Sequence, residues 1–360
     1  MRYRVKLALV VLIVVLLGAA IAAAPRLMRP AAVKRVVSVR VLESVRSPYF
    51  LPQYLAQNLG FFKEEHLQVS ISTTSPEAIR AALADGRADI VICGMQKVIF
   101  NPDNKAPRPV VFAAAAARDG SLLLARKGKD TEDFQWQKMK RKSIIGGSHD
   151  DSSEIALEDV LRRNNLQPYR EVTIYNNIPD TLRMGAFRTG TGNYIQLLEP
   201  DASLAELKGY GHVVASVGSA AGDMVVTAYA ALPAYVESDP EVIQRFTNAI
   251  YKAQLWLSQH SAEEAAEAAA PSFPSLDKII LQKSIERYRS LGVWNCSPLL
   301  SRESYERFQS AAKGAGEIAA AIPYESAVVT SFASQAIETV TYVRNDEQPK
   351  KKTLFNLFSR

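Results

Sequence analysis

The chain has 360 residues, of which 48% are hydrophobic and 22% charged. This length and apolar content exclude a disordered chain and allow two ordinary domains with well-packed cores. The net charge of +6 comes from the ends: residues 1–35 hold seven Lys or Arg and no acid, and residues 344–360 hold five against two acids. The body is left with about −4, which gives no support to nucleic-acid binding, because that requires a basic face on the folded domain.

The N-terminal segment, residues 1–35, has the pattern of an export signal. Arg2, Arg4 and Lys6 precede an uncharged apolar run from Leu7 to Ala24, as in secretory signals, and the run also reaches the lower length limit of a membrane span. A cleaved signal peptide and a retained membrane anchor both remain open. Either one places the body outside the cytoplasm, in the periplasm or at the outer face of the cytoplasmic membrane.

The first half of the body alternates strands and helices. Residues 38–44 (SVRVLES) alternate as a strand, a helical stretch opens at Ser47-Pro48, and a strand at 68–73, a helix at 76–86 and a strand at 88–93 follow. Further strands are expected at 109–116 and 121–126. This β-α-β-α-β order predicts a parallel sheet covered by helices.

The same order begins again at residues 143–147 (SIIGG). A helix at 153–165, a strand at 171–176, a helix at 179–190 and strands at 194–200 and 212–217 follow. A strand at 224–232 then precedes a run of helices to about residue 340, and residues 341–360 form a basic tail that we expect to be flexible. The sequence therefore predicts an α/β protein of two lobes, each a mostly parallel sheet flanked by helices, with a helical C-terminal region.

The segments that follow these strands are the first candidates for a binding site. Ligands of open parallel sheets bind beyond the carboxyl ends of the strands, where helix N-termini present free N–H groups. Gly94 follows a buried strand directly, and its missing side chain would let the backbone approach a ligand. The segments at these positions are Ser47 to Tyr49, Gly94 to Gln96, Ser148 to Ser153, and Glu199.

The loop after the strand at 143–147, GGSHDDSSE, has three possible roles: phosphate binding, metal binding, or one wall of a small-molecule cleft. It lacks the spacing and the lysine of a phosphate-binding loop, and its aspartates would repel phosphate. His149, Asp150 and Asp151 are consecutive and therefore point in different directions, so they make a poor metal site. Asp151 followed by Glu154 fits a helix capping box. We therefore expect Asp151 to Ser153 to cap the helix, and Ser148, His149 and Asp150 to face the cleft.

Several longer blocks carry a family resemblance. These are SPYFLPQYLAQNLGFFKEEHLQVSIST, AALADGRADIVICG, GAFRTGTGNYIQLLEP and RYRSLGVWNCSPLL, in this order and spacing. Together they resemble ABC-transporter substrate-binding proteins of the family that serves thiamine precursors, sulfonates, taurine and nitrate. The resemblance covers about residues 38–335.

This resemblance implies a type II periplasmic-binding-protein fold that closes on one small molecule. The first lobe would comprise residues 36–122, completed by a return strand and helices at 224–340, and the second lobe residues 123–223. The ligand contacts implied by the resemblance are Ser47, Pro48, Tyr49, Gly94, Met95, Gln96, Ser148, His149, Asp150, Thr191, Asn193 and Glu199.

The sequence also departs from the family pattern. Relatives often carry a basic, glycine-rich loop where this chain has Ser148 to Asp151, and an Asp where it has Asn193. An acidic loop disfavours an anionic ligand by like-charge repulsion and favours a cationic or amine-bearing one.

These features predict a non-catalytic solute-binding component of an ABC importer. Its partners would be a small polar or nitrogen-containing ligand and a membrane permease, with no cofactor, metal or nucleic acid, and the protein would act as a monomer. Two alternatives are an exported enzyme of the thiamine-precursor synthase type and a membrane-anchored ligand sensor. The enzyme is disfavoured because its cysteine-rich signature is missing, with only Cys93 and Cys296 in the chain.

Overall fold

The computed structural model describes residues 35–100, 107–126, 134–148 and 151–344, and all its helices and strands belong to the unit Val37–Arg360. The predicted export segment and the tail beyond residue 344 lie outside the described residues, apart from Arg35. Among the described residues, no helix is both long and apolar enough to span a bilayer.

The described strands form two five-stranded sheets, and each of the ten predicted strands overlaps one of them. The first sheet contains β1 (Val37–Glu43), β2 (Leu67–Thr73), β3 (Ile90–Gly94), β4 (Val110–Ala114) and β10 (Thr227–Ala231), in the order β2-β1-β3-β10-β4. The second contains β5 (Leu122–Arg126), β6 (Ser143–Ile145), β7 (Thr173–Tyr175), β8 (Tyr194–Leu197) and β9 (Gly211–Ser216), in the order β7-β6-β8-β5-β9. We call the two groups of elements lobe 1 and lobe 2.

Each sheet has one antiparallel strand, and that strand is the first one after the chain crosses over from the other lobe. β5 runs antiparallel to β8 and β9, whereas β6 pairs in parallel with β7 and β8. β10 runs antiparallel to β3 and β4 after the chain returns to lobe 1. The prediction of two mostly parallel sheets with a helical C-terminal region is therefore confirmed.

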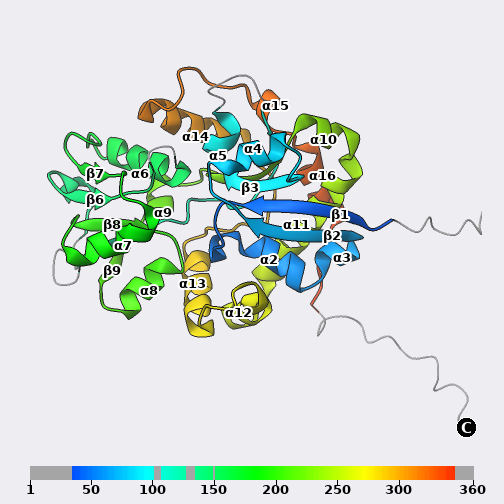
Figure 1. Cartoon of the computed structure of the whole chain (residues 1–360), viewed down its shortest axis with the longest axis horizontal. Helices are drawn as coiled ribbons and strands as arrows, with labels where there is room; N and C mark the ends of the chain where they lie inside the picture. Colours follow the sequence, from blue (N-terminus) through cyan, green and yellow to red (C-terminus); the bar gives the residue numbers. More distant parts are fainter. Residues whose placement is uncertain (1–34, 101–106, 127–133, 149–150, 345–360) are drawn as a thin grey trace, which may run out of the picture. The chain divides into compact units, whose positions relative to one another are not determined.

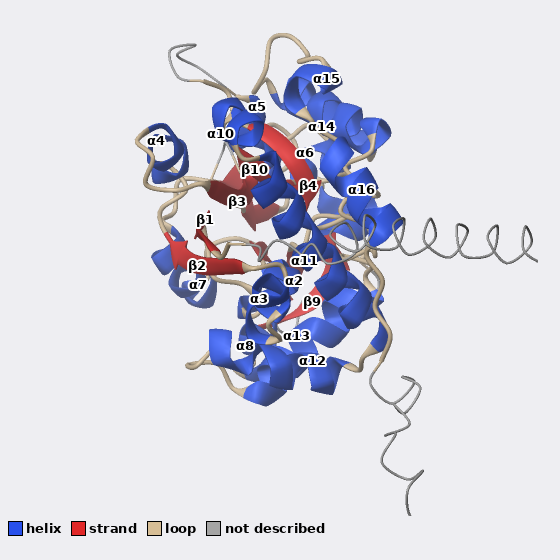
Figure 2. Ribbon diagram, turned by 90° about the vertical axis from the view of Figure 1, so that its right-hand side faces the viewer, coloured by secondary structure: helices blue, strands red, loops and turns tan. Residues whose placement is uncertain are grey.

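Helices flank the strands in both lobes (Figures 1 and 2). The early helices are η1 (Pro48–Phe50), α2 (Leu51–Asn58), α3 (Phe61–Glu64), α4 (Ala78–Ala84) and α5 (Met95–Ile99). Lobe 2 contains η2 (Trp136–Met139), α6 (Ser152–Arg163), α7 (Asp180–Thr189), α8 (Asp201–Leu207) and α9 (Val217–Ala221). The C-terminal region contains α10 (Pro233–Ser238), α11 (Pro240–Gln259), α12 (Ala262–Ala269), η3 (Ala270–Ser272), α13 (Lys278–Ser290), α14 (Arg302–Ala315), α15 (Tyr324–Ala327) and α16 (Ser331–Thr339).

The strand pattern explains how the second sheet is buried on both faces. Leu122 and Leu124 of β5 join one apolar cluster with Ile145 and Ile195, whereas Leu123 of the same strand joins the larger cluster that runs into lobe 1. Successive side chains of a strand point to opposite faces. An unbroken apolar run such as LLLA is thus what a sheet covered by helices on both sides requires.

Candidate functional site

A cavity of about 630 Å³ lies where the two lobes meet, at the carboxyl ends of β1, β6 and β8. Lobe 1 contributes the loop after β1 and Pro76; lobe 2 contributes the start of α6, the first turns of α7 and the segment from Gln196 into α8. We call this the interlobe cavity. Its lining consists of Ser44, Val45, Arg46, Ser47, Pro76, Ser121, Gly147, Asp151, Ser153, Asp180, Arg183, Met184, Gln196, Leu197, Leu198, Glu199, Pro200, Asp201, Leu204, Ala205, Lys208 and Tyr210.

The loop after β6 is shaped by two glycines and a buried glutamate. A Cβ added at Gly146 would stand 2.4 Å from Glu154 Oε2, so this position requires glycine. The N–H of Gly147 donates to Glu154 Oε2 at 2.9 Å. Asp151 caps α6 by accepting a hydrogen bond from the N–H of Ser153 at 3.0 Å. The predicted cap is thus present at Asp151, but Glu154 reaches back to Gly147 rather than to the cap residue.

Two buried carboxyl groups stand behind this edge of the cavity. Burial, together with the nearby Glu158, raises the pKa of Glu154 to about 8. Both effects disfavour the charged carboxylate: burial removes its hydration, and the negative charge of Glu158 repels it. Burial also raises the pKa of Asp119 to about 6, although hydrogen bonds from Ser121 and Ser153 act in the opposite direction. Glu154 is therefore mostly protonated at neutral pH.

A hydrogen-bonded network connects Asp119 to Gln196 across the cavity floor. Asp119 precedes β5 and accepts from the N–H of Ser121 at 2.9 Å and from Ser153 Oγ at 2.5 Å. The Ser121 hydroxyl also donates to Asp119. Gln196 Nε2 donates to Ser121 Oγ at 2.8 Å and to the Ser153 carbonyl oxygen at 2.9 Å. The side chains of this network come from the segment that crosses between the lobes, from α6 and from β8.

Three of the predicted contact residues, Ser47, Gln96 and Glu199, take part in bonds that join the lobes to each other. Ser47 Oγ donates to the Glu199 carbonyl oxygen at 2.7 Å, and Ser152 Oγ donates to Gln96 Oε1 while accepting weakly from the Gln96 N–H at 3.4 Å. Ser47 also lines the interlobe cavity, whereas Gln96 does not. These residues were expected to contact a ligand, and in this conformation their polar groups bridge lobe 1 and lobe 2.

Gly94 permits this bridge. A Cβ at Gly94 would stand 2.1 Å from Gln96 Oε1 and 2.8 Å from Ser152 Oγ. A ligand was expected to come close to the backbone at Gly94. In this conformation the side chains of Gln96 and Ser152 occupy that space.

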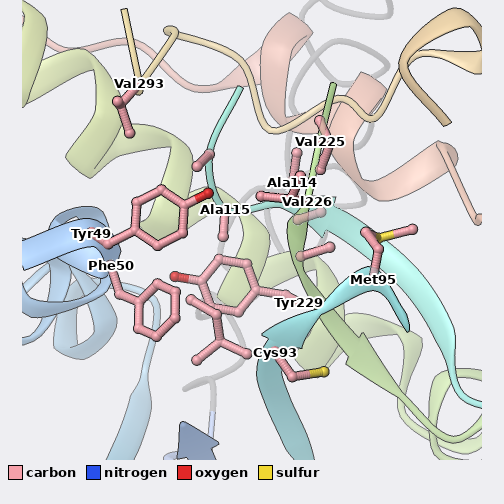
Figure 3. Packing of buried hydrophobic residues seen from close by; sticks show 14 of the residues in the cluster. Tyr49, Phe50, Cys93, Met95, Ala114, Ala115, Val225, Val226, Tyr229 and Val293 are labelled. Atoms are coloured by element: carbon pink, nitrogen blue, oxygen red, sulfur yellow. The ribbon is translucent and has the colours of Figure 1, made fainter. Parts of the chain in front are cut away.

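The structure buries Pro48 in η1, and it places Tyr49 and Met95 in the hydrophobic core (Figure 3). Tyr49 is 3% exposed and Met95 is fully buried. The Tyr49 hydroxyl donates to the Arg118 carbonyl oxygen at 2.9 Å, and its ring packs on Tyr288. In this conformation the three side chains face the protein interior, and a ligand contact at these positions stays a prediction.

Thr191 and Asn193 lie at the amino end of β8 in the second sheet, opposite the strand ends that line the interlobe cavity. Both precede β8, and Asn193 Oδ1 accepts from the N–H of Ser143 at the start of β6 at 2.9 Å. They line a separate cavity of about 470 Å³, beside Arg126. The interlobe cavity lies at the carboxyl ends of these strands, so Thr191 and Asn193 are not among its lining residues. A ligand contact at these two residues stays a prediction.

Glu199 lies at the interlobe cavity, but its carboxylate is used inside the protein. The side chain is fully buried and accepts from Arg287 at 2.6 Å, from Ser203 Oγ at 2.9 Å and from Ser284 Oγ at 3.3 Å. Arg287 and Ser284 belong to α13, which packs against α12 and η1, whereas Ser203 belongs to α8 of lobe 2. The carboxylate therefore joins α8 to α13 and is not presented to a ligand.

The other predicted positions divide between exposed and undescribed residues. Ser148 is exposed, and its carbonyl oxygen accepts from the Asp151 N–H at 2.9 Å. His149 and Asp150 lie outside the described residues. Cys93 is buried and Cys296 exposed, and the two thiols are not joined. In the described ranges, no group of three His, Cys, Asp or Glu side chains is arranged to hold a metal ion.

The cavity residues that the sequence analysis missed include four polar ones, Gln196, Arg183, Arg46 and Ser121. Gln196 is a polar residue inside the apolar strand YIQLL, and it is only 3% exposed. A buried amide in a strand needs hydrogen-bond partners. That mismatch was the available signal for Gln196.

Comparison with known proteins agrees with this architecture. The family model described as NMT1/THI5 like matches residues 47–264. YtlA, a candidate binding protein of Bacillus subtilis, is 34% identical over 303 residues, which cover 83% of this chain and 90% of YtlA. The 4-amino-5-hydroxymethyl-2-methylpyrimidine phosphate synthase THI13 of Saccharomyces cerevisiae is 26% identical over 230 residues, 58% of this chain and 63% of that enzyme.

A solved structure confirms the fold at low sequence identity. The ligand-binding component of an ABC-type import system from Staphylococcus aureus, solved with zinc bound, superposes with a TM-score of 0.68 at 12% identity, covering 83% of this chain and 98% of that one. The predicted resemblance to periplasmic binding proteins is therefore confirmed. Because the matched segment runs from the end of β1 into α12 and spans both lobes, the chain belongs to the NMT1/THI5-like family.

Proposed function

We propose that this protein is the extracytoplasmic solute-binding component of an ABC importer. The observation that carries the proposal is the interlobe cavity, about 630 Å³ and lined by both lobes at the carboxyl ends of their strands. A cavity of this size suits one small polar molecule. The similarity to YtlA and to the Staphylococcus aureus import component supports the same function.

The proposed mechanism is closure of the two lobes around the ligand. The chain crosses between the sheets twice, from β4 to β5 and from α9 to β10. Bonds such as Ser47 to Glu199 and Ser152 to Gln96 exist only when the lobes are together. A ligand that contacts both lobes would shift the open and closed populations toward the closed form, which a permease can then recognise.

The location and the partner follow from the same proposal. Export through the segment 1–35 would place the binding lobes in the periplasm or at the outer face of the membrane, beside the permease. The boundaries at residues 123 and 223 would separate lobe 2 from lobe 1, and we expect a monomer. Retention of the N-terminal segment as an anchor would keep the protein near its permease.

Thermal unfolding of the purified full-length protein tests this function. We would measure Tm with pyrimidines, polyamines, amino acids, sulfonates and nitrate, because a ligand that binds only the folded state raises Tm. We expect one chemical class to raise Tm in a saturable manner. A flat response to every class would contradict the proposal.

The similarity to the yeast synthase makes an enzyme the second candidate. Mass spectrometry of each stabilising compound after incubation with the protein distinguishes the two functions. An unchanged compound is expected of a binding protein, whereas conversion to a product would favour the enzyme.

A further inference from the structure

We infer that Gln196 is a specificity-determining residue of the interlobe cavity, and that it selects ligands with an N–H or O–H donor over oxyanions. This inference rests on the proposed solute-binding function and names the chemical class of the solute. Gln196 is 3% exposed and lines the cavity. Both residues that hold its side chain, Ser121 and Ser153, line it as well.

The orientation of the Gln196 amide follows from its two partners. Nε2 stands 2.8 Å from Ser121 Oγ and 2.9 Å from the Ser153 carbonyl oxygen. A backbone carbonyl oxygen can only accept, so the amide group that faces Ser153 must be the nitrogen. Rotating the amide by half a turn would bring two acceptor oxygens together.

Asp119 fixes the role of the Ser121 hydroxyl, so that Ser121 Oγ, like the Ser153 carbonyl oxygen, accepts a hydrogen bond from Gln196 Nε2. The Ser121 hydroxyl donates its only proton to the Asp119 carboxylate, and the Ser153 hydroxyl donates to the other carboxylate oxygen at 2.5 Å. With its proton engaged, Ser121 Oγ offers Gln196 a lone pair. Both neighbours of the amide therefore require a donor, and the nitrogen supplies both bonds.

The amide oxygen is the group left over. Gln196 Oε1 is buried and has no hydrogen-bond partner among the described residues. A buried acceptor without a partner is costly, and the cost is relieved when a donor reaches it. Because this oxygen can only accept, the complementary ligand group is a donor, as in an amide, an amine or an alcohol.

The charged residues of the cavity carry both signs. Asp151, Asp180 and Asp201 line it and repel an anion, whereas Arg46, Arg183 and Lys208 line it and attract one. Arg46 donates to Glu43 at 3.0 Å, and Arg183 donates to the Gln196 carbonyl oxygen at 2.5 Å and pairs with Asp180 at 3.5 Å, which weakens the attraction of both guanidinium groups for a sulfonate or nitrate. Arg183 Nε is buried without a hydrogen-bond partner among the described residues, so an acceptor elsewhere on the same ligand would complement it.

Matched probe pairs test the inference. Nicotinamide and nicotinate, benzamide and benzoate, and benzylamine and benzenesulfonate would each be titrated into the full-length protein, with binding measured by calorimetry and by Tm. We expect the donor-bearing member to bind at least about tenfold tighter, because an oxyanion leaves Gln196 Oε1 without a donor. Gln196→Leu should reduce this preference to below about threefold.

Gln254→Leu is the control. Gln254 is 4% exposed, lies on α11 outside the interlobe cavity lining, and also has a buried amide oxygen without a partner among the described residues. This variant should keep the wild-type preference. Equal or tighter binding of the oxyanions by the wild-type protein overturns the inference and leaves the solute-binding function standing. The wild-type comparison alone decides this, even if Gln196→Leu fails to fold. Binding of no probe at all would overturn the inference, whereas the solute-binding function is decided separately by the Tm panel of solute classes.

Discussion

We expect Glu154 to make the protein less stable as the pH rises from 6 to 8, and replacing Glu154 by Gln should remove most of that loss. Glu154 is fully buried, and its pKa is raised from 4.5 to about 8. A carboxyl group with a raised pKa in the folded state binds its proton more tightly there than in the unfolded chain. Its contribution is therefore complete below pH 4.5 and is lost as the pH rises through about 8.

The size of this effect follows from the two pKa values. Over the whole interval from 4.5 to about 8, the free energy of unfolding falls by about 5 kcal/mol because of Glu154. Between pH 6 and pH 8 the loss is about 2 kcal/mol. Asp119, with a pKa raised to about 6, loses most of its own contribution below this range. The interval from pH 6 to pH 8 thus isolates Glu154.

Urea unfolding of both proteins at pH 6, 7 and 8 measures the difference. The three tryptophans provide the fluorescence signal. Glutamine resembles the protonated acid and can still accept from the Gly147 N–H, so the variant should be about as stable as the wild type at pH 6 and more stable at pH 8. Contributions common to both proteins cancel in the difference. Equal pH slopes for the two proteins would refute the raised pKa of Glu154.

Two further predictions concern the contacts between elements. Arg287→Met leaves the fully buried Glu199 carboxylate without its cation and should lower the free energy of unfolding by about 3 kcal/mol, whereas Arg40→Met, at the exposed pair with Asp89, should leave the urea midpoint nearly unchanged. Gly218→Ala would place a Cβ 2.0 Å from the Asp119 carbonyl oxygen and should cost about 2 kcal/mol or more. Gly185→Ala, with open space around it in α7, should stabilise by up to about 1 kcal/mol. Urea or thermal unfolding checks each pair, and equal effects within a pair would contradict the packing that separates them.

The fold was predictable because the strands of this chain are apolar runs bounded by turns. Each run that predicted a strand overlaps one in the structure. The predicted strand at 194–200 was too long, since β8 ends at Leu197 and the chain turns into α8. Short helices such as α5, α8 and α9 were not predicted, because five to seven residues are too few for a helical period to stand out.

The candidate site was predictable in position but not in side-chain direction. The segments after β1, β6 and β8 do meet at the interlobe cavity. Whether Tyr49 points into that cavity or into the core depends on packing with Tyr288, a residue far away in the sequence. Thr191 and Asn193 were assigned by resemblance, although their place before a strand already put them at the amino edge of the sheet.

The same few residues hold the lobes together and shape the interlobe cavity. Ser153 donates to Asp119 in the crossing segment and accepts from Gln196 in β8, while its neighbour Ser152 bonds to Gln96 of lobe 1. The first turn of α6 therefore contacts lobe 1, the crossing segment and the cavity floor at once. Opening the lobes must break the bond between Ser152 and Gln96, and any movement of α6 against the crossing segment also disturbs the serines that orient the Gln196 amide. Because one helix end carries both sets of bonds, we expect opening of the lobes to change the surroundings of the Gln196 amide, which would couple ligand selection to closure.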